Sequence, residues 1–225
     1  LTQHLGGVTE EDVRRLARLA IRDDGRISAA DIARVLKAKH EMLAASEVLL
    51  LETGVPDLTQ LGGFGNLKRW LEVRREAFLG HGAGSPLPAP KGMLLLGVQG
   101  AGKSLAAKCV AGAWQLPLFR LDFGALYNKF HGESERNIRE ALAVANAMAP
   151  CVLWMDEIEK GVAADSGGDA DGGVSRRVLG TLLTWMSERT ARVFLVATAN
   201  DISQLPPELL RKGRFDEVFF VYLPG

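Results

Sequence analysis

The stretch that decides the fold is Met93-Leu-Leu-Leu-Gly97-Val-Gln-Gly-Ala-Gly102-Lys103-Ser104. It begins with an apolar run of strand length and continues as Gly-x-x-x-x-Gly-Lys-Ser, the pattern of a phosphate-binding loop. Glycines let backbone amides point inward around phosphate oxygens, and a helix that begins at Lys103 turns its positive end toward an anion. The alternative is an ordinary glycine-rich turn, but the strand before and the helix after favour the phosphate site.

In this loop Lys103 would supply a fixed positive charge to the terminal phosphates, and Ser104 would offer its hydroxyl to magnesium. The predicted nucleotide-binding residues of the loop are Gly97, Val98, Gln99, Gly100, Ala101, Gly102, Lys103, Ser104 and Leu105.

Outside the loop, strands and helices alternate. Strand-length apolar runs lie at 93–96, 118–121, 152–155, 193–197 and 218–223, and helical segments lie near 103–113, 134–148 and 174–188. Continuous apolar runs separated by helices are typical of a parallel sheet covered on both faces. The sequence therefore predicts an α/β fold with a five-stranded parallel sheet between layers of helices.

The residues before this α/β core show a different pattern of apolar residues. Residues 9–50 show helical spacing of apolar residues, and a linker with Pro56 and several glycines follows. We predict a helical segment over 1–54 and the α/β domain over 55–225. The Gly- and Asp-rich stretch 161–173 is expected to be a flexible acidic loop. Because the chain begins with Leu1, we expect it to be part of a longer protein.

Composition excludes several classes of function. Basic and acidic residues balance at 27 each, which argues against a duplex-binding face and a nucleic-acid partner, while a narrow local basic patch stays open. No run approaches the ~18 apolar residues of a membrane span. Cys109 and Cys151 lie in apolar surroundings, which indicates buried thiols in a reducing compartment. A zinc-protease site is excluded because the His-Glu pair at His40 has Ala44 where the second histidine would stand.

Two carboxylates end the buried run that begins at Cys151. Asp156 would hold magnesium through water, and Glu157 would orient and polarise an attacking water. The alternative is a solvated acidic turn that includes Glu159. The pair is a weak signal alone, but a strong one downstream of a phosphate-binding loop.

Further polar residues follow the next strand. The amide of Asn200 could bond the water or the terminal phosphate, although Asn200 also suits a turn. Arg211 and Arg214 follow a short helix that Pro206 would begin, and arginine stabilises spreading phosphoryl charge. A solvated basic turn is the alternative for these arginines.

The order of these motifs resembles the AAA clade of AAA+ ATPases: the phosphate-binding loop, then Asp-Glu, then Ala-Thr-Ala-Asn, then Leu-Leu-Arg-x-Gly-Arg-Phe-Asp. The resemblance runs from about Leu61 to Leu223. It is most similar to the conserved chloroplast and cyanobacterial open-reading-frame family and its bacterial relatives, on Ala89–Gly100, Trp114–Leu118, Ala149–Trp154 and Thr184–Glu188.

The resemblance implies roles that composition and spacing do not. ATP and Mg²⁺ would be bound, with Gln60, Leu61 and Gly62 along the adenine and Asn200 sensing the γ-phosphate. Arg211 and Arg214 would reach into a neighbouring subunit's site in a ring, expected to be a hexamer. Phe130 matches the aromatic of the loop that grips substrate in the ring's pore, and His131 beside it replaces what is usually a small apolar residue. A core position at a helix end is the alternative for Phe130.

Members of that family also carry a helical lid after the α/β domain, and this sequence stops at Gly225 before one. Two functions therefore stay open: an ATP-driven ring that remodels or translocates a protein substrate, and a nucleotide-switched regulatory scaffold with little motor activity. The expected location is the cytoplasm of a bacterium, or the chloroplast stroma for a plastid-encoded protein.

Overall fold

The computed structural model describes residues 10–20, 29–43, 48–80, 88–128, 133–162 and 168–223. The predicted pore residues Phe130 and His131 lie outside the described residues.

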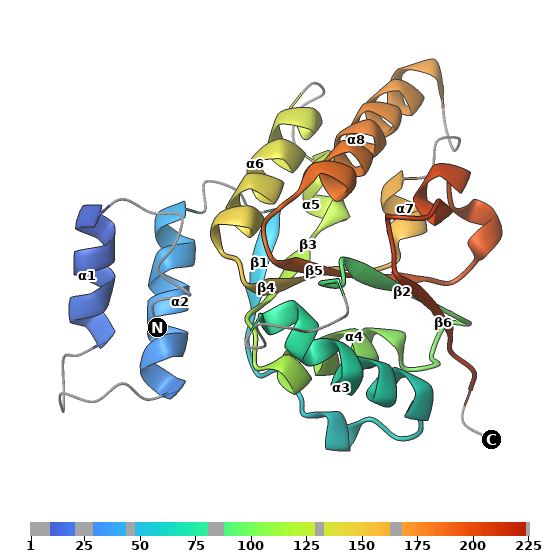
Figure 1. The fold of residues 1–225 in the computed structure, drawn as a ribbon. Coiled ribbons are helices and arrows are strands. Elements are labelled where there is room, and N and C mark those ends of the chain that lie inside the picture. The colour runs from blue at the N-terminus through green and yellow to red at the C-terminus, as the bar shows by residue number, and fades with distance from the viewer. Residues whose placement is uncertain are drawn as a thin grey trace.

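The five predicted strands lie side by side and run parallel (Figure 1). This confirms the predicted α/β fold. In their order across the sheet they are β3 (Leu118–Leu121), β4 (Cys151–Met155), β5 (Val193–Ala199), β2 (Gly92–Leu96) and β6 (Glu217–Phe220).

A sixth strand, β1 (Leu49–Glu52), pairs antiparallel with β3 at the edge of the sheet. These residues belong to the helical segment predicted from the sequence, and that prediction is wrong for Leu49–Glu52. The strand is short, and an apolar run of this length has no period that separates a strand from a helix. Where the α/β domain begins stays a prediction.

Apolar side chains of the parallel strands divide alternately between the two faces of the sheet. Met93 and Leu95 of β2 belong to one hydrophobic cluster, and Leu94 and Leu96 to the other. This period of two is the geometry of a strand, and because both faces are buried the sequence shows an unbroken apolar run.

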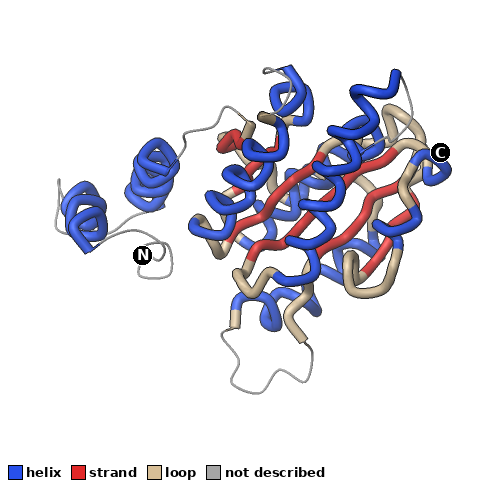
Figure 2. The backbone as a smooth tube through the Cα atoms, turned by 90° about the horizontal axis from the view of Figure 1, so that it is seen from above, coloured by secondary structure: helices blue, strands red, loops and turns tan. Residues whose placement is uncertain are grey.

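Helices cover both faces. Figure 1 shows α3 (Gly65–Leu79) and α4 (Lys103–Trp114) below the sheet, and α6 (Ser134–Ala147) and α8 (Gly168–Glu188) above it. The view from above in Figure 2 shows helices crossing over the row of strands. Two short helices, α5 (Phe123–Asn128) and α7 (Ile158–Val162), pack in the same hydrophobic cluster as α6 and α8.

The acidic loop predicted over 161–173 is wrong where the structure describes it. Residues 161 and 162 end α7, and α8 already begins at Gly168. The prediction relied on the low helix propensity of glycine, and tertiary context overrides such local preferences.

Two amphipathic helices, α1 (Glu10–Ala20) and α2 (Ala29–Leu43), lie beside the β1 edge (Figure 1). The buried Lys39 of α2 donates to the carbonyl of Ala147 at 2.6 Å, at the C-terminal end of α6. His40 contacts the carbonyl of Leu49 at 3.1 Å and the ring of Phe119. Polar and aromatic contacts thus attach α2 to the sheet.

Three 3₁₀ turns complete the described elements: η2 (Leu58–Gln60), η3 (Ile202–Gln204) and η4 (Pro207–Leu210). The last is the short helix predicted to begin at the proline pair. Within the described ranges, no helix has the length and apolar character needed to cross a bilayer. Cys109 and Cys151 are both buried free thiols, as predicted, and burial raises the pKa of Cys151 to about 12.

Candidate functional site

The glycine-rich loop connects the C-terminal end of β2 to the first turn of α4. Gly97 must lack a side chain, because a Cβ there would lie 2.0 Å from the carbonyl oxygen of Val221. Gly102 has a φ of 87°, a left-handed conformation that favours glycine, and α4 begins at the next residue. The loop therefore ends at a helix N-terminus, the arrangement that binds phosphate.

Lys103 is the first residue of α4 and is 6% exposed. Its Nζ donates to the carbonyls of Gly97 and Val98 at 2.6 and 2.8 Å, so the ammonium lies inside the loop. A third bond, of 2.8 Å, goes to Oδ1 of Asn200 at the end of β5. Lys103 thus links the loop to the neighbouring strand.

Burial lowers the pKa of Lys103, and the negative charges of Glu159, Asp156 and Glu157 oppose that change. An ammonium surrounded by carboxylates keeps its charge more readily than burial alone would allow. The site therefore holds a positive charge at the loop and negative charges on the opposite side.

Asp156 follows β4 and faces Ser104. The Ser104 hydroxyl donates to Oδ1 of Asp156 at 3.1 Å, and the Thr198 hydroxyl donates to the same oxygen at 2.6 Å. The backbone amide of Glu157 donates to the Thr198 hydroxyl at 2.9 Å. Thr198 is fully buried in β5 and holds both members of the acidic pair.

Glu157 has both carboxylate oxygens engaged. Oε1 accepts from Nδ2 of Asn200 at 3.0 Å, and Oε2 accepts from Lys160 at 2.5 Å. The bond from Lys160 and then the bond from Asn200 lower the pKa of Glu157, which stays an anion at neutral pH. Its backbone φ of 47° is left-handed, a costly conformation for a non-glycine residue and one that occurs at functional sites.

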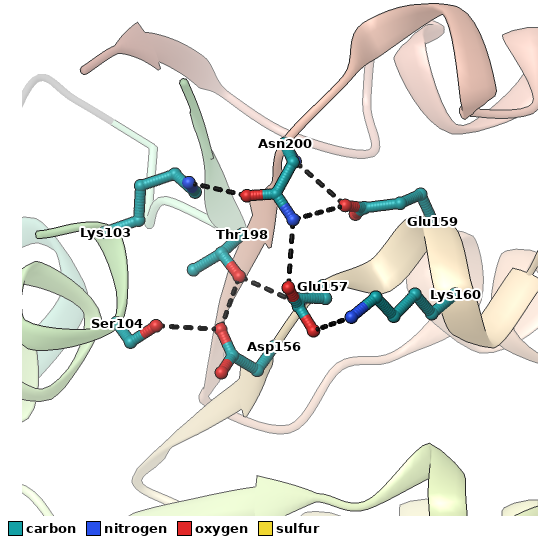
Figure 3. A network of polar contacts seen from close by, with 8 residues as sticks. All are labelled: Lys103, Ser104, Asp156, Glu157, Glu159, Lys160, Thr198 and Asn200. Atoms are coloured by element: carbon teal, nitrogen blue, oxygen red, sulfur yellow. Dashed lines mark hydrogen bonds and ion pairs between the residues drawn. The ribbon is translucent and has the colours of Figure 1, made fainter. Parts of the chain in front are cut away.

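Asn200 is the centre of the network drawn in Figure 3. Its amide oxygen accepts from Lys103, and its amide nitrogen donates to Glu157 and Glu159. Asn200 therefore contacts both the phosphate-binding loop and the acidic segment, and its role in hydrolysis stays a prediction. Thr198 lies in β5 and Asn200 directly follows that strand. The other residues of the network come from the segments that follow β2 and β4.

Three members of this network are not predicted from the sequence: Thr198, Glu159 and Lys160. The sequence assigns no role to Thr198 or Lys160, and it predicts Glu159 only as part of a solvated turn. Glu159 is 3% exposed, so the solvated reading is wrong for it. The signal for Thr198 was a polar residue within a buried apolar run, where such residues need a partner.

An open cavity of about 1140 Å³ adjoins the loop. Leu61 and Gly62, predicted to lie along the adenine, line it, whereas Gln60 is exposed and is not among the lining residues. Gly100, Ala101, Gly102 and Leu105 of the loop line the same cavity. Val98 and Gln99 are exposed on the loop.

The two arginines after η4 differ in their surroundings. Arg211 is exposed, whereas Arg214 is half-buried with a buried Nη1 atom that has no hydrogen-bond partner among the described residues. The turn is held by Asp216, whose carboxylate accepts from the amides of Lys91 and Gly92. Within the described part of the chain, no hydrogen bond joins either arginine to the network around Asn200.

The oxygen donors of the site fit a magnesium ion that binds together with a nucleotide. Ser104 and Asp156 offer oxygen ligands, which this hard cation prefers. No group of three or more His, Cys, Asp or Glu side chains in the described ranges could hold a metal by themselves. Magnesium commonly takes one or two protein ligands together with phosphates and water, so the residues present suffice.

Comparisons with known proteins agree with this geometry. Residues 93–223 match the family described as "ATPase family associated with various cellular activities (AAA)". Residues 1–46 match a second one, "SpoVK-like AAA ATPase, second domain".

Several curated proteins are similar over nearly the whole chain. The "Uncharacterized AAA domain-containing protein ycf46" of Guillardia theta is 44% identical over 97% of this chain and 43% of its own length. The protein of the same description from Trieres chinensis is 43% identical over 100% of the chain and 45% of its own length.

The "ATPase family protein 2 homolog" of Caenorhabditis elegans is 31% identical over 100% of this chain and 31% of its own length. The chain therefore spans less than half the length of these curated relatives. The match over 93–223, together with the phosphate-binding loop, shows that the chain belongs to the AAA family of ATPases.

Proposed function

We propose that this protein binds ATP with Mg²⁺ at the loop 97–104 and hydrolyses it with Glu157 as the group that polarises water. The observation that carries the proposal is the network in which Lys103, Asp156, Glu157 and Asn200 converge at the carboxyl ends of neighbouring parallel strands. Ligands of open α/β sheets bind at that edge.

Each residue has a chemical task in this proposal. Lys103 and the amides at the start of α4 would bind the terminal phosphates. Mg²⁺, held by the Ser104 hydroxyl and through water by Asp156, would neutralise charge on the phosphate oxygens. Glu157 would accept a hydrogen bond from the attacking water and so polarise it. Its lowered pKa keeps the carboxylate in the anionic form that this role requires.

The structure also indicates what must change for hydrolysis. Both oxygens of Glu157 already have partners, Asn200 and Lys160. Each of these oxygens can accept a further hydrogen bond, so a water can be polarised by Glu157 beside them. All three N–H donors of Lys103 are engaged, so a bound phosphate competes with Asn200 for Lys103. We infer that nucleotide binding rearranges this network before the chemical step.

The arginines support a shared site. Arg211 is exposed, and Arg214 has a guanidinium nitrogen without a partner among the described residues, so both could donate to a phosphate of an adjacent subunit. We propose self-association into a ring, with a hexamer as the expected size, and remodelling of a protein substrate as its work. The proposed location is the bacterial cytoplasm or the chloroplast stroma.

The test of ATP binding compares the full-length protein with its Lys103→Ala variant by calorimetry. Loss of binding is expected, because the substitution removes the cation from the centre of the loop. Lys37→Ala, which truncates an exposed lysine on α2, is the matched control and should bind ATP normally. Equal affinity in wild type and Lys103→Ala would contradict the assignment of the loop.

The test of the shared site mixes two inactive variants, Glu157→Gln and Arg211→Ala. In a mixed ring an intact arginine faces an intact glutamate at some interfaces, so turnover should return. Arg214→Ala replaces Arg211→Ala in a parallel mixture. A mixture that co-assembles by native mass spectrometry and stays inactive would mean that the arginines do not act across subunits.

A further inference from the structure

The least expected group in the site is the carboxylate of Glu159, on the single-turn helix α7 directly after the acidic pair. It is 3% exposed, more deeply buried than the side chains of Asp156 and Glu157. Its Oε2 atom is buried and has no hydrogen-bond partner among the described residues. A buried carboxylate that is only half satisfied costs stability, so its presence calls for a reason other than folding.

The satisfied oxygen of Glu159 makes all its contacts with one residue. Oε1 accepts from the backbone amide of Asn200 at 2.9 Å and from its side-chain Nδ2 at 2.9 Å. Glu159 therefore holds both ends of Asn200, the main chain and the amide group, at one point. Figure 3 shows the carboxylate facing Asn200 from the side opposite Lys103.

These contacts decide which way the Asn200 amide points. In the observed orientation, its nitrogen donates to the carboxylates of Glu157 and Glu159, and its oxygen accepts from Lys103. A rotation by 180° would place the amide oxygen against two carboxylate oxygens and the amide hydrogens against an ammonium. Both contacts would be repulsive, so the surrounding charges permit one orientation only.

Of these three partners, Glu159 is the one that the proposed reaction does not require elsewhere. Lys103 is needed by the phosphates and Glu157 by the water. When either leaves Asn200, the bond to Glu159 is what keeps the amide in place. We propose that Glu159 is a positioning residue, which fixes Asn200 so that its amide stays aimed at the reacting groups through hydrolysis.

This inference rests on the proposed ATPase function and extends it to a residue outside the acidic pair. If the inference is correct, the oxygen at position 159 that accepts the hydrogen bonds of Asn200 is essential for positioning, and the negative charge of the side chain matters less. Glu159→Gln keeps an oxygen at the Oε1 position, whereas Glu159→Met has a similar unbranched shape without an acceptor. The two variants therefore separate hydrogen bonding from packing.

Steady-state turnover and ATP affinity are measured for both variants in the full-length protein. Glu159→Met should lower kcat by about tenfold to a hundredfold, the scale of a misplaced group in an active site, with ATP affinity within about twofold. Glu159→Gln should keep kcat within about threefold of wild type. Equal losses in the two variants, or no loss in Glu159→Met, would overturn the inference.

A double-mutant cycle distinguishes positioning from general damage. If Glu159 acts only through Asn200, adding Glu159→Met to Asn200→Ala should cause no further loss of kcat. A destabilised fold would instead lower kcat in both backgrounds by the same factor, and that additive result would overturn the inference. Melting temperatures of all variants accompany the cycle.

A second measurement does not depend on turnover. In ¹⁵N-labelled protein, the side-chain NH₂ of Asn200, identified by its loss in Asn200→Ala, should exchange slowly with solvent. Exchange should become faster in Glu159→Met and stay slow in Glu159→Gln. If wild type fails to hydrolyse ATP but shows this pattern, the proposed function is wrong and the positioning stands. Fast exchange already in wild type would refute the positioning itself.

Discussion

Thr198 offers the sharpest test of the hydrogen bonds that hold the acidic pair. In Thr198→Val the shape of the side chain is kept, but the hydroxyl that donates to Asp156 at 2.6 Å and accepts from the amide of Glu157 at 2.9 Å is lost. Because Thr198 is fully buried, no bulk water takes the place of that hydroxyl.

The expected loss of stability follows from the hydrogen bonds that Asp156 and the amide of Glu157 keep in Thr198→Val. Asp156 retains the bond from Ser104, whereas the amide of Glu157 loses its acceptor. Leaving such a group unsatisfied costs about 1–3 kcal/mol. For a protein of this size, each kcal/mol lowers the melting temperature by roughly 2–4 °C. We therefore expect a fall of roughly 4–8 °C for a loss of about 2 kcal/mol.

The assay is thermal denaturation of wild type, Thr198→Val and the control Thr198→Ser. Serine keeps the hydroxyl and loses one methyl group, a cost of about 1 kcal/mol. If only packing mattered, Thr198→Val would be more stable than Thr198→Ser. If the hydrogen bonds of the hydroxyl dominate, Thr198→Ser is the more stable variant. If Thr198→Val is the more stable of the two, the hydroxyl does not hold the acidic pair and the reasoning fails.

Two further predictions concern other parts of the molecule. In Lys160→Met, the bond that contributes most to lowering the pKa of Glu157 is lost; since Glu157 must be ionised, the acid limb of kcat/KM should move to higher pH, and an unchanged profile would show that Lys160 does not set that pKa. Phe130→Ala should leave the melting temperature nearly unchanged if Phe130 lines a pore, because only a buried phenylalanine loses about 3–5 kcal/mol on truncation; a large drop would place it in the core.

The sequence predicted the parallel strands because both faces of the sheet are buried. Cys151–Met155 and residues 193–197 are unbroken apolar runs, and turns and helices separate them clearly. Strand β1 escaped prediction because it follows two helices, pairs antiparallel and has only a short apolar run. Its identity depends on the free edge of β3, which local sequence does not reveal.

The site was predictable where spacing encodes chemistry and not where burial decides it. Lys103 and Ser104 follow from the glycine pattern, and Asp156 and Glu157 from their place at the end of a buried strand. Glu159 looks like a surface residue of a short helix, since charged residues are seldom buried. Only the fold brings its carboxylate to the main-chain amide of Asn200, forty-one positions along the chain.

The proposed role of Glu157 in polarising the attacking water can be tested in a single turnover. Excess full-length protein is mixed with radiolabelled ATP and Mg²⁺, and bound ATP and ADP are measured over time for wild type and Glu157→Gln. Wild type should convert its bound ATP to ADP, while Glu157→Gln should retain ATP and cleave it at least about a hundredfold more slowly, the scale expected for a positioned base. Conversion at the wild-type rate by Glu157→Gln would contradict the assignment of this carboxylate to hydrolysis.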